Sequence, residues 1–143
     1  MNYTYSYPRP AVTVDIILFN EDMEILLIKR KNKPFEGAWA FPGGFVDENE
    51  GLEDAARREL MEETCLEAGK LEQSGAFGQP GRDPRGHTIS IVFTGRVIDS
   101  RKLQAADDAT EARWFSLKDL PELAFDHQEI LEYFNKKQNE GRE

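Results

Sequence analysis

Three glutamates between residues 59 and 63 have a spacing that suits the binding of a divalent cation. At about 100° per residue in a helix, Glu59, Glu62 and Glu63 fall within one wedge of roughly 100°. Like charges at this spacing repel one another, and the cost rises with burial unless a cation lies among them. Clusters of oxygen ligands suit hard cations such as Mg²⁺ or Mn²⁺. Taken alone, the three residues also fit a simpler interpretation, a solvent-exposed acidic helix face.

The residues around these glutamates predict a strand, a glycine-rich loop and a helix. Pro42-Gly43-Gly44 is a turn signal that ends an extended segment. From Leu52 onward the chain consists of good helix formers, with neither Gly nor Pro before Gly69. Gly51 occupies the N-cap position of this helix. The loop and the helix would therefore bring backbone groups and carboxylates to one place.

The whole stretch 44–66 resembles the signature of the Nudix hydrolases, G-x5-E-x7-R-E-U-x-E-E-x-G-U, in which U is a bulky aliphatic residue. Eight of its nine specified positions match at the required spacing: Gly44, Glu50, Arg58, Glu59, Leu60, Glu62, Glu63 and Leu66. Cys65 stands where the family has Gly. Nudix enzymes use a bound divalent metal to cleave a diphosphate linked to another moiety, so the resemblance implies that reaction class.

The resemblance also implies roles for the charged residues of the signature and for its first glycine. Glu59 and Glu63 are expected to bind Mg²⁺ or Mn²⁺, with Glu62 as a further ligand or as the catalytic base. The backbone oxygen of Gly44 is expected to complete the metal site. Arg58 is expected to orient the glutamates by ion pairing, and Glu50 to tie the loop to the helix through a similar pair. The sequence leaves the number of metal ions open.

The segment QPGRDPRGH, residues 79–87, carries the candidates for substrate binding. Its prolines and glycines predict a fixed, irregular loop, and guanidinium groups bind a diphosphate well. Arg82 and Arg85 are therefore expected to bind phosphate, but pairing of an arginine with Asp83 inside the loop is an equal alternative. The loop resembles a stretch of Nudix ADP-ribose pyrophosphatases and of Nudix regulators of NAD metabolism. Gly43 is a further candidate for substrate binding.

Three other segments carry less specific candidates. The N-terminal arm, residues 1–10, contains Tyr3, Tyr5 and Tyr7; we expect a loosely held arm, with Tyr5 stacking on a nucleobase, across a homodimer, as the functional alternative. The basic run 29–33 is expected at a solvated hairpin end, with one phosphate contact as the alternative. Some Nudix enzymes take their base or an extra ligand from a late loop, and three acids suit that role here: Asp107, Asp108 and Glu111.

Length and composition exclude several classes of protein. The 143 residues suit one domain, 1–143, and 39% hydrophobic with 31% charged residues is typical of a globular protein. A net charge of −9 argues against nucleic acid as a partner. A single cysteine excludes an internal disulfide, and no apolar run is long enough to cross a membrane. The expected location is the cytoplasm.

Hydropathy patterns predict the remaining elements. Strands are expected at 11–19, 24–31, 70–79, 87–97 and 112–115, and a last helix is expected to begin at Asp126 and to fray over 135–143. Strong helix formers after Cys65 favour extension of the glutamate-bearing helix to Gly69, although Leu66 is a fixed packing position in the Nudix family. The pattern predicts an α/β/α sandwich with a mixed sheet (an α+β fold), and the resemblance implies the same Nudix fold.

The function expected from these features is metal-dependent hydrolysis of ADP-ribose to AMP and ribose 5-phosphate. One alternative is an enzyme of the same class that acts on nucleoside triphosphates or dinucleoside polyphosphates. Another is a non-catalytic module that senses ADP-ribose or a related NAD metabolite. In the regulators that contain such modules, a DNA-binding domain follows the Nudix part. Here the chain ends one helix after Pro121, which favours the enzyme.

Overall fold

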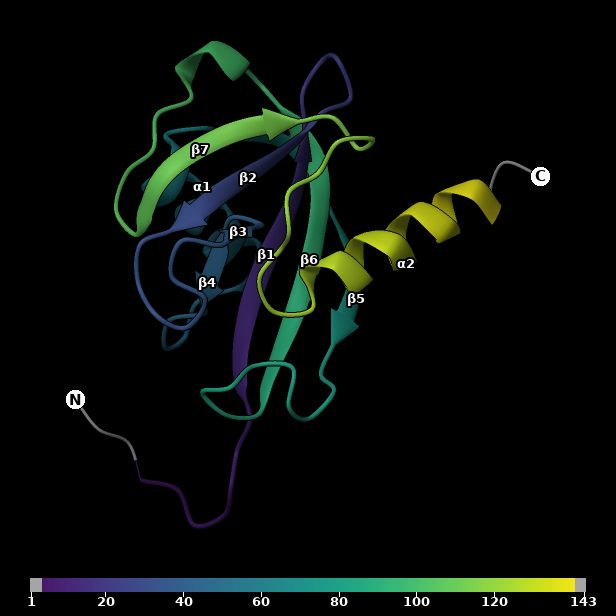
Figure 1. Ribbon diagram of the computed structural model, residues 1–143. Coiled ribbons are helices and arrows are strands. Elements are labelled where there is room, and N and C mark those ends of the chain that lie inside the picture. Colours follow the sequence, from purple (N-terminus) through teal and green to yellow (C-terminus); the bar gives the residue numbers. More distant parts are fainter. Residues whose placement is uncertain (1–3, 141–143) are drawn as a thin grey trace.

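A seven-stranded sheet with helices on its faces forms the body of the protein (Figure 1). The structure is a computed structural model and describes residues 4–140. The elements are β1 (Ala11–Phe19), β2 (Ile25–Arg30), β3 (Trp39–Ala40), β4 (Gly43–Phe45), α1 (Leu52–Thr64), β5 (Ala68–Phe77), β6 (Thr88–Val97), a short 3₁₀ helix (Ser100–Lys102), β7 (Ala109–Phe115) and α2 (His127–Glu140). The predicted strands and both predicted helices are present, with shifts at their ends.

The sheet is mixed, as predicted. Its main order is β3-β2-β1-β6-β5, with β4 paired to β1 and β7 paired to β2. The long pairing of β1 with β6 is parallel, whereas the other pairings are antiparallel. Strand β1 therefore lies at the centre, in contact with strands that come from distant parts of the chain. Residues on β1 can reach both the loop before α1 and the loop before β6.

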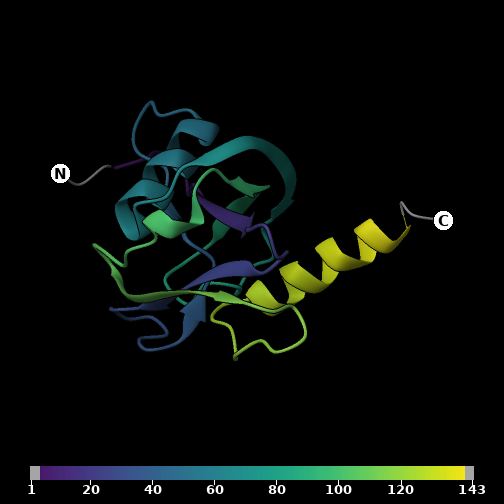
Figure 2. The ribbon, with the colours of Figure 1, turned by 90° about the horizontal axis from the view of Figure 1, so that it is seen from above.

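Alternation along β1 divides the apolar core into two clusters. Val14, Ile16 and Leu18 pack with the buried alanines and leucine of α1. Ile17 and Phe19 face the other way and pack with the buried side of α2. Figure 2 shows the two helices on opposite sides of the sheet, which confirms the predicted sandwich.

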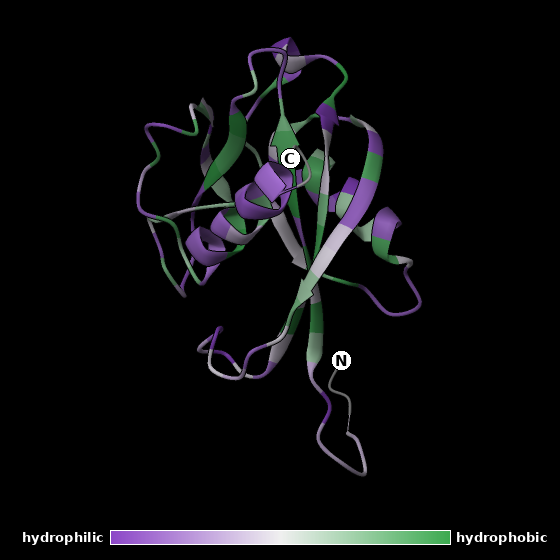
Figure 3. Ribbon diagram, turned by 90° about the vertical axis from the view of Figure 1, so that its right-hand side faces the viewer, coloured by the Kyte–Doolittle hydropathy of each residue, from purple (hydrophilic) through white to green (hydrophobic). Residues whose placement is uncertain are grey.

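Helix α2 is anchored by its first turns and extends beyond the sheet (Figures 1 and 2). His127, Ile130 and Leu131 are buried, whereas the later turns are largely exposed and hydrophilic (Figure 3). The predicted fraying is wrong as far as Glu140, because the helix continues to that residue; 141–143 lie outside the described residues. Within residues 4–140, no helix is long and apolar enough to cross a membrane.

The end of α1 differs from the prediction. The helix stops at Thr64, and Cys65 takes a left-handed conformation with φ of 62°. Its backbone N–H still donates to the carbonyl of Met61 at 3.0 Å. The prediction of an extension to Gly69 is wrong because burial of Leu66, which is 1% exposed, outweighs the local helix propensity. Strand β5 consequently starts at Ala68, two residues earlier than predicted.

Candidate active site

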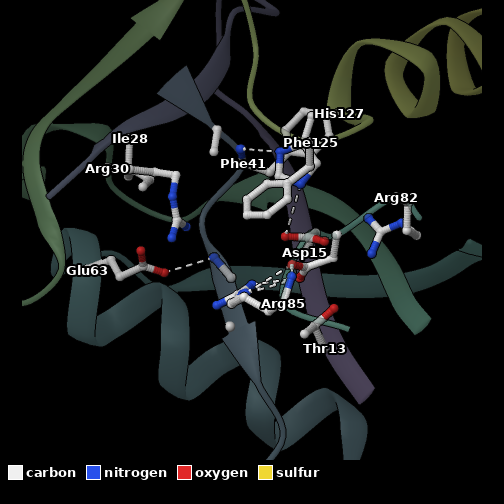
Figure 4. Close-up of a pocket in the computed structure, with 14 residues that line it drawn as sticks. Thr13, Asp15, Ile28, Arg30, Phe41, Glu63, Arg82, Arg85, Phe125 and His127 are labelled. Atoms are coloured by element: carbon white, nitrogen blue, oxygen red, sulfur yellow. Dashed lines mark hydrogen bonds and ion pairs between the residues drawn. The ribbon is translucent and has the colours of Figure 1, made fainter. Parts of the chain in front are cut away.

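A pocket lies where the β3–β4 turn, α1, the 78–87 loop and the start of α2 meet around β1 (Figure 4). This turn consists of residues 41–44, which include the first two residues of β4 and carry the glycines that precede the glutamate-bearing helix. Fourteen residues line the pocket: Thr13, Asp15, Ile28, Arg30, Ala40, Phe41, Gly43, Gly44, Glu63, Arg82, Asp83, Arg85, Phe125 and His127. Candidates predicted from the 44–66 stretch and from the 79–87 loop are thus brought together.

Arg58 holds two acidic side chains of the helix, and Glu50 from the loop before it, in place. Its Nη1 lies 2.9 Å from Glu59 Oε1 and 3.2 Å from Glu62 Oε2. Its Nε and Nη2 bind both oxygens of Glu50 at 2.7 and 2.9 Å, and Nη2 also donates to the carbonyl of Phe45. These bonds lower the pKa of Glu50 to about 2. The ion pairs expected for Arg58 and Glu50 are therefore present, and they tie the loop to the helix.

Glu63 points into the pocket and is separated from the Arg58 cluster. Its Oε1 accepts a hydrogen bond from the backbone N–H of Gly43 at 2.8 Å, and the residue is 4% exposed. Burial raises the pKa of Glu63 to about 9, which the Gly43 bond partly opposes. The nearby carboxylates of Glu59, Asp15 and Asp108 raise it further. Among residues 4–140, no basic side chain forms an ion pair with Glu63, and the carboxyl group therefore keeps its proton at neutral pH.

The acids around Glu59 and Glu63 fit a hard divalent cation by their chemistry. Burial raises the pKa of Glu59, against the effect of Arg58, and Glu62 and Asp107 add to the rise. A Cβ on Gly44 would lie 2.6 Å from the Glu59 carboxyl carbon, so only glycine allows this close approach. Among residues 4–140, however, no three His, Cys, Asp or Glu side chains converge as a ready-made metal site. Reorientation of side chains away from Arg58 would be needed to gather the ligands.

The two loop arginines have different environments. Both oxygens of Asp126 accept hydrogen bonds from Arg82, at 2.7 and 2.9 Å, and the Arg82 side chain is only 5% exposed. Arg85 pairs with Asp83 at 2.8 Å but keeps 39% of its side chain exposed at the pocket. Its guanidinium also lies 4.7 Å from the ring centre of Phe45. The intraloop pairing alternative is observed for Arg85, whereas Arg82 pairs with the residue before α2 and so fixes the loop.

Arg30 is a pocket residue that was not among the predicted site residues. It ends β2, and its Nε donates to the carbonyl of Pro34 at 2.8 Å. Burial and the nearby charge of Arg85 lower the pKa of Arg30. Figure 4 shows Arg30 beside Glu63 at one end of the pocket, with Arg82 at the other end. The only sequence signal was the basic run 29–33, in which nothing distinguished Arg30 from its neighbours.

The remaining candidates lie outside this pocket. Glu111 on β7 binds Lys29 and Arg113, and the Arg113 bond lowers its pKa, the opposite of what a general base needs. Asp108 lies closer and lines the adjoining cleft with Glu59 and Glu63. Tyr5 is 50% exposed on the N-terminal arm, where the guanidinium of Arg9 lies 4.3 Å from its ring centre. Tyr3, the first tyrosine of that arm, lies outside the described residues.

A buried polar pair forms the floor of the pocket. Asp15 points toward the α2 side of the sheet and accepts a hydrogen bond from Ser90. His127 Nε2 lies 3.6 Å from Asp15 Oδ1. Burial acts to raise the pKa of Asp15, but His127 and the Ser90 bond together hold it below its ordinary value. The aspartate is the charged residue in an otherwise uncharged strand, yet sequence reasoning did not identify it as a site residue.

The glutamates, glycines and arginines described above suit the cleavage of a phosphoanhydride bond, and comparison with known proteins shows the class of protein. Residues 9–134 match the NUDIX domain family. The chain therefore belongs to the Nudix family, and it is a Nudix hydrolase. Members of this family generally use divalent metals. The family fold accounts for the mixed sheet and the two helices.

Two relatives and one solved structure that resemble this chain have ADP-ribose in their names. The chain is 50% identical over 133 residues to the ADP-ribose pyrophosphatase of Methanocaldococcus jannaschii, covering 93% of this chain and 78% of that protein. It is 35% identical over 133 residues to the ADPR responsive transcriptional repressor NtrR of Acinetobacter baylyi, covering 88% of this chain and 53% of that protein. The NUDIX domain of Shewanella oneidensis NrtR, complexed with ADP ribose, superimposes with a TM-score of 0.83 at 33% identity, covering 96% and 94% of the two chains.

Proposed function

We propose that the protein hydrolyses ADP-ribose to AMP and ribose 5-phosphate. The observation that carries this proposal is one pocket that is lined by Arg30 and Arg85 together with Glu63 and the glycines Gly43 and Gly44. Basic groups suited to a diphosphate thus share a pocket with an acid suited to a divalent cation. The identity of 50% to an ADP-ribose pyrophosphatase supports the choice of substrate.

The acids would hold Mg²⁺ or Mn²⁺. Glu59 and Glu63 are the proposed ligands with the backbone oxygen of Gly44, and Glu62 is a further ligand or the base that accepts the proton of water. When bound, such a cation neutralises diphosphate charge and lowers the pKa of a coordinated water. Arg58 keeps the glutamates oriented, because it contacts Glu59 and Glu62 but does not line the pocket. Its role is therefore in positioning.

Arg30 and Arg85 would bind the diphosphate. Both guanidiniums are at least partly desolvated, and each lies near the ring of Phe125, at 5.0 and 5.5 Å. Their charge supplies a local positive field in a chain whose net charge is −9. Arg82 would act indirectly, by fixing the loop that presents Arg85. In the reaction, water forms a bond to one phosphorus while the bridging P–O bond breaks, so AMP and ribose 5-phosphate each keep one phosphate.

Two parts of the proposal concern partners. The substrate is a nucleotide, and no role for nucleic acid is proposed because the chain is acidic. A homodimer that uses the N-terminal arm stays a prediction, which sedimentation of the full chain and of a variant lacking residues 1–10 would test. The same oligomeric state for the two proteins would exclude a role of the arm in assembly.

A hydrolysis panel tests the proposal directly. ADP-ribose, NADH, diadenosine polyphosphates and nucleoside triphosphates are each incubated with the protein and Mg²⁺ or Mn²⁺, and the products are identified. We expect the highest kcat/KM for ADP-ribose, with AMP and ribose 5-phosphate as products. If a triphosphate ranks above ADP-ribose, the substrate assignment is wrong.

Binding without hydrolysis is the second candidate function, favoured by the similarity to the ADPR responsive repressor. The presence of Glu59, Glu62 and Glu63 favours hydrolysis instead. Calorimetric titration with ADP-ribose in EDTA, followed by turnover assays with Mg²⁺ and with Mn²⁺, separates the two. Tight binding with no product in either metal would establish the sensing function.

A further inference from the structure

The turn 41–44 is held in place from two sides of the pocket. On the α1 side, the N–H of Gly43 donates to Glu63 Oε1 at 2.8 Å. On the α2 side, the N–H of Phe41 donates to His127 Nδ1 at 3.1 Å, and Figure 4 shows both bonds. The turn between these two bonds is where the chain meets the proposed metal site. Its position therefore depends on His127 as well as on Glu63.

The bond from Phe41 fixes the tautomer of His127. A backbone N–H can only donate, so Nδ1 must be unprotonated and the proton of the neutral ring is on Nε2. Nε2 faces Asp15 Oδ1 at 3.6 Å, and the other oxygen of Asp15 is bound by Ser90. His127 is 3% exposed and stacks on the Phe41 ring, with the ring centres 4.6 Å apart. The imidazole has little freedom to turn or flip.

We propose that His127 is a positioning residue for the hydrolysis, and that Asp15 acts through it by keeping the proton on Nε2. His127 would fix the position of the backbone from Phe41 to Gly44. The Gly43 bond to Glu63 and the close approach of Gly44 to Glu59 both depend on that position. Because a displacement of about 1 Å at a reacting centre can cost 10²-fold in rate, this backbone position matters for kcat. The assignment rests on the proposed hydrolytic function.

The residues around His127 support this role. Phe125, Asp126 and His127 are consecutive, and each contacts a different part of the site. Phe125 lines the pocket with φ of 53°, a strained conformation for a residue other than glycine. Asp126 binds Arg82 through both oxygens. The start of α2 thus fixes the phosphate-binding loop and the glycine turn together.

Isosteric substitutions separate positioning from direct contact with substrate. In His127→Asn the amide oxygen lies near the former Nδ1, so the Phe41 bond is kept and the group facing Asp15 is lost. In His127→Gln the amide nitrogen reaches toward the former Nε2, so the group facing Asp15 is kept and the Phe41 bond is lost. His127→Ala loses both. Gln128→Ala, at the exposed neighbour of His127 on α2, is the matched control.

Two readouts are needed, one of which does not use substrate. The first is kcat and KM with saturating Mg²⁺ and ADP-ribose; the second is hydrogen exchange of the Phe41 amide by NMR in the substrate-free protein. We expect His127→Gln and His127→Ala to lose about 10–100-fold in kcat with KM changed less than about 3-fold. Both should exchange the Phe41 amide faster. His127→Asn should keep the amide protected and retain most of the kcat.

Asp15→Asn tests the tautomer. An amide nitrogen at residue 15 would donate to Nε2 and drive the proton to Nδ1, where it opposes the Phe41 N–H. We expect a kcat loss similar to that of His127→Gln, and little further loss when Asp15→Asn is added to His127→Asn. Independent, multiplicative losses in the double variant would refute the action of Asp15 through His127.

Other outcomes would overturn the positioning role itself. If His127→Gln retained the wild-type kcat while His127→Asn lost kcat and changed KM, His127 would contact the substrate directly through Nε2. An unchanged Phe41 amide in His127→Ala would show that the imidazole does not hold the turn. Since exchange is measured without substrate, this result stays decisive even if ADP-ribose proves not to be hydrolysed.

Discussion

Replacement of Glu63 by Gln should stabilise the metal-free protein, although it removes a proposed ligand. The folded state holds this carboxyl with a pKa of about 9, against an ordinary value of 4.5. Between these two values the folded chain keeps a proton that the unfolded chain releases. The free energy of unfolding of the wild type therefore falls as pH rises through this window, by at most about 1.4 kcal/mol per pH unit. Glutamine does not titrate and avoids this loss.

The expected gain follows from the same two values. At pH 7, 2.5 units above the unfolded pKa, Glu63→Gln should exceed the wild type by about 3 kcal/mol in free energy of unfolding, on the order-of-magnitude scale of such shifts. Near pH 4 the two proteins should be equally stable. The Gly43 N–H can still donate to the amide oxygen of Gln, so the contact itself is conserved.

Urea unfolding in EDTA at several pH values measures this difference, with the fluorescence of Trp39 and Trp114 as the signal. The matched control is Glu62→Gln, because the Glu62 side chain is 42% exposed and its ion pair with Arg58 is worth at most about 1 kcal/mol. A stability difference between Glu63→Gln and wild type that stays constant from pH 5 to 8 would refute the burial argument. Glu63→Gln should also lose at least about 100-fold in kcat with Mg²⁺.

Three further predictions concern the arginines and the end of α1. Arg85→Ala and Arg30→Ala should each raise the KM for ADP-ribose about tenfold or more while leaving Mg²⁺ affinity unchanged, and a normal KM in both would exclude them from phosphate binding. Arg82→Ala should lower the free energy of unfolding by about 3 kcal/mol in urea, since it leaves the carboxylate of Asp126 unpaired; a loss below about 1 kcal/mol would contradict the buried pair. Cys65→Gly should raise that free energy by about 1 kcal/mol, because Gly adopts positive φ without strain, and no gain would show that the left-handed backbone is not strained.

The part of the site on α1 could be predicted because its geometry is local. Residues three and four positions apart on a helix are neighbours, so the contact of Arg58 with Glu62 follows from spacing alone. Spacing could not predict which glutamates of the wedge pair with Arg58 and which one enters the pocket. Whether a glutamate of the wedge pairs with Arg58 or enters the pocket depends on where the 41–44 turn presents the Gly43 N–H, and the turn belongs to a different element.

The end of α1 shows a conflict between local and tertiary preferences. Leu66, Glu67 and Ala68 all favour helix, and a Cys at the left-handed position disfavours a stop. Burial of the Leu66 side chain and pairing of Ala68 with Val97 in the sheet are both lost if the helix continues. The gain from burying one leucine, about 1.5–3 kcal/mol, exceeds the strain of about 1–2 kcal/mol at Cys65. Local propensity was therefore the weaker guide at this position.

The floor of the pocket was the least predictable part, yet the sequence held a signal for it. Asp15 is an acid in the middle of β1, between apolar neighbours, and a buried carboxylate must be bound by donors. Alternation places it on the face opposite to Val14 and Ile16, toward α2. Nothing local indicates that its partner is His127, since the contacts of this histidine with Phe41 and Asp15 join residues far apart in the chain. An isolated acid in a buried strand thus predicts that a partner exists, but only the tertiary packing of α2 identifies it.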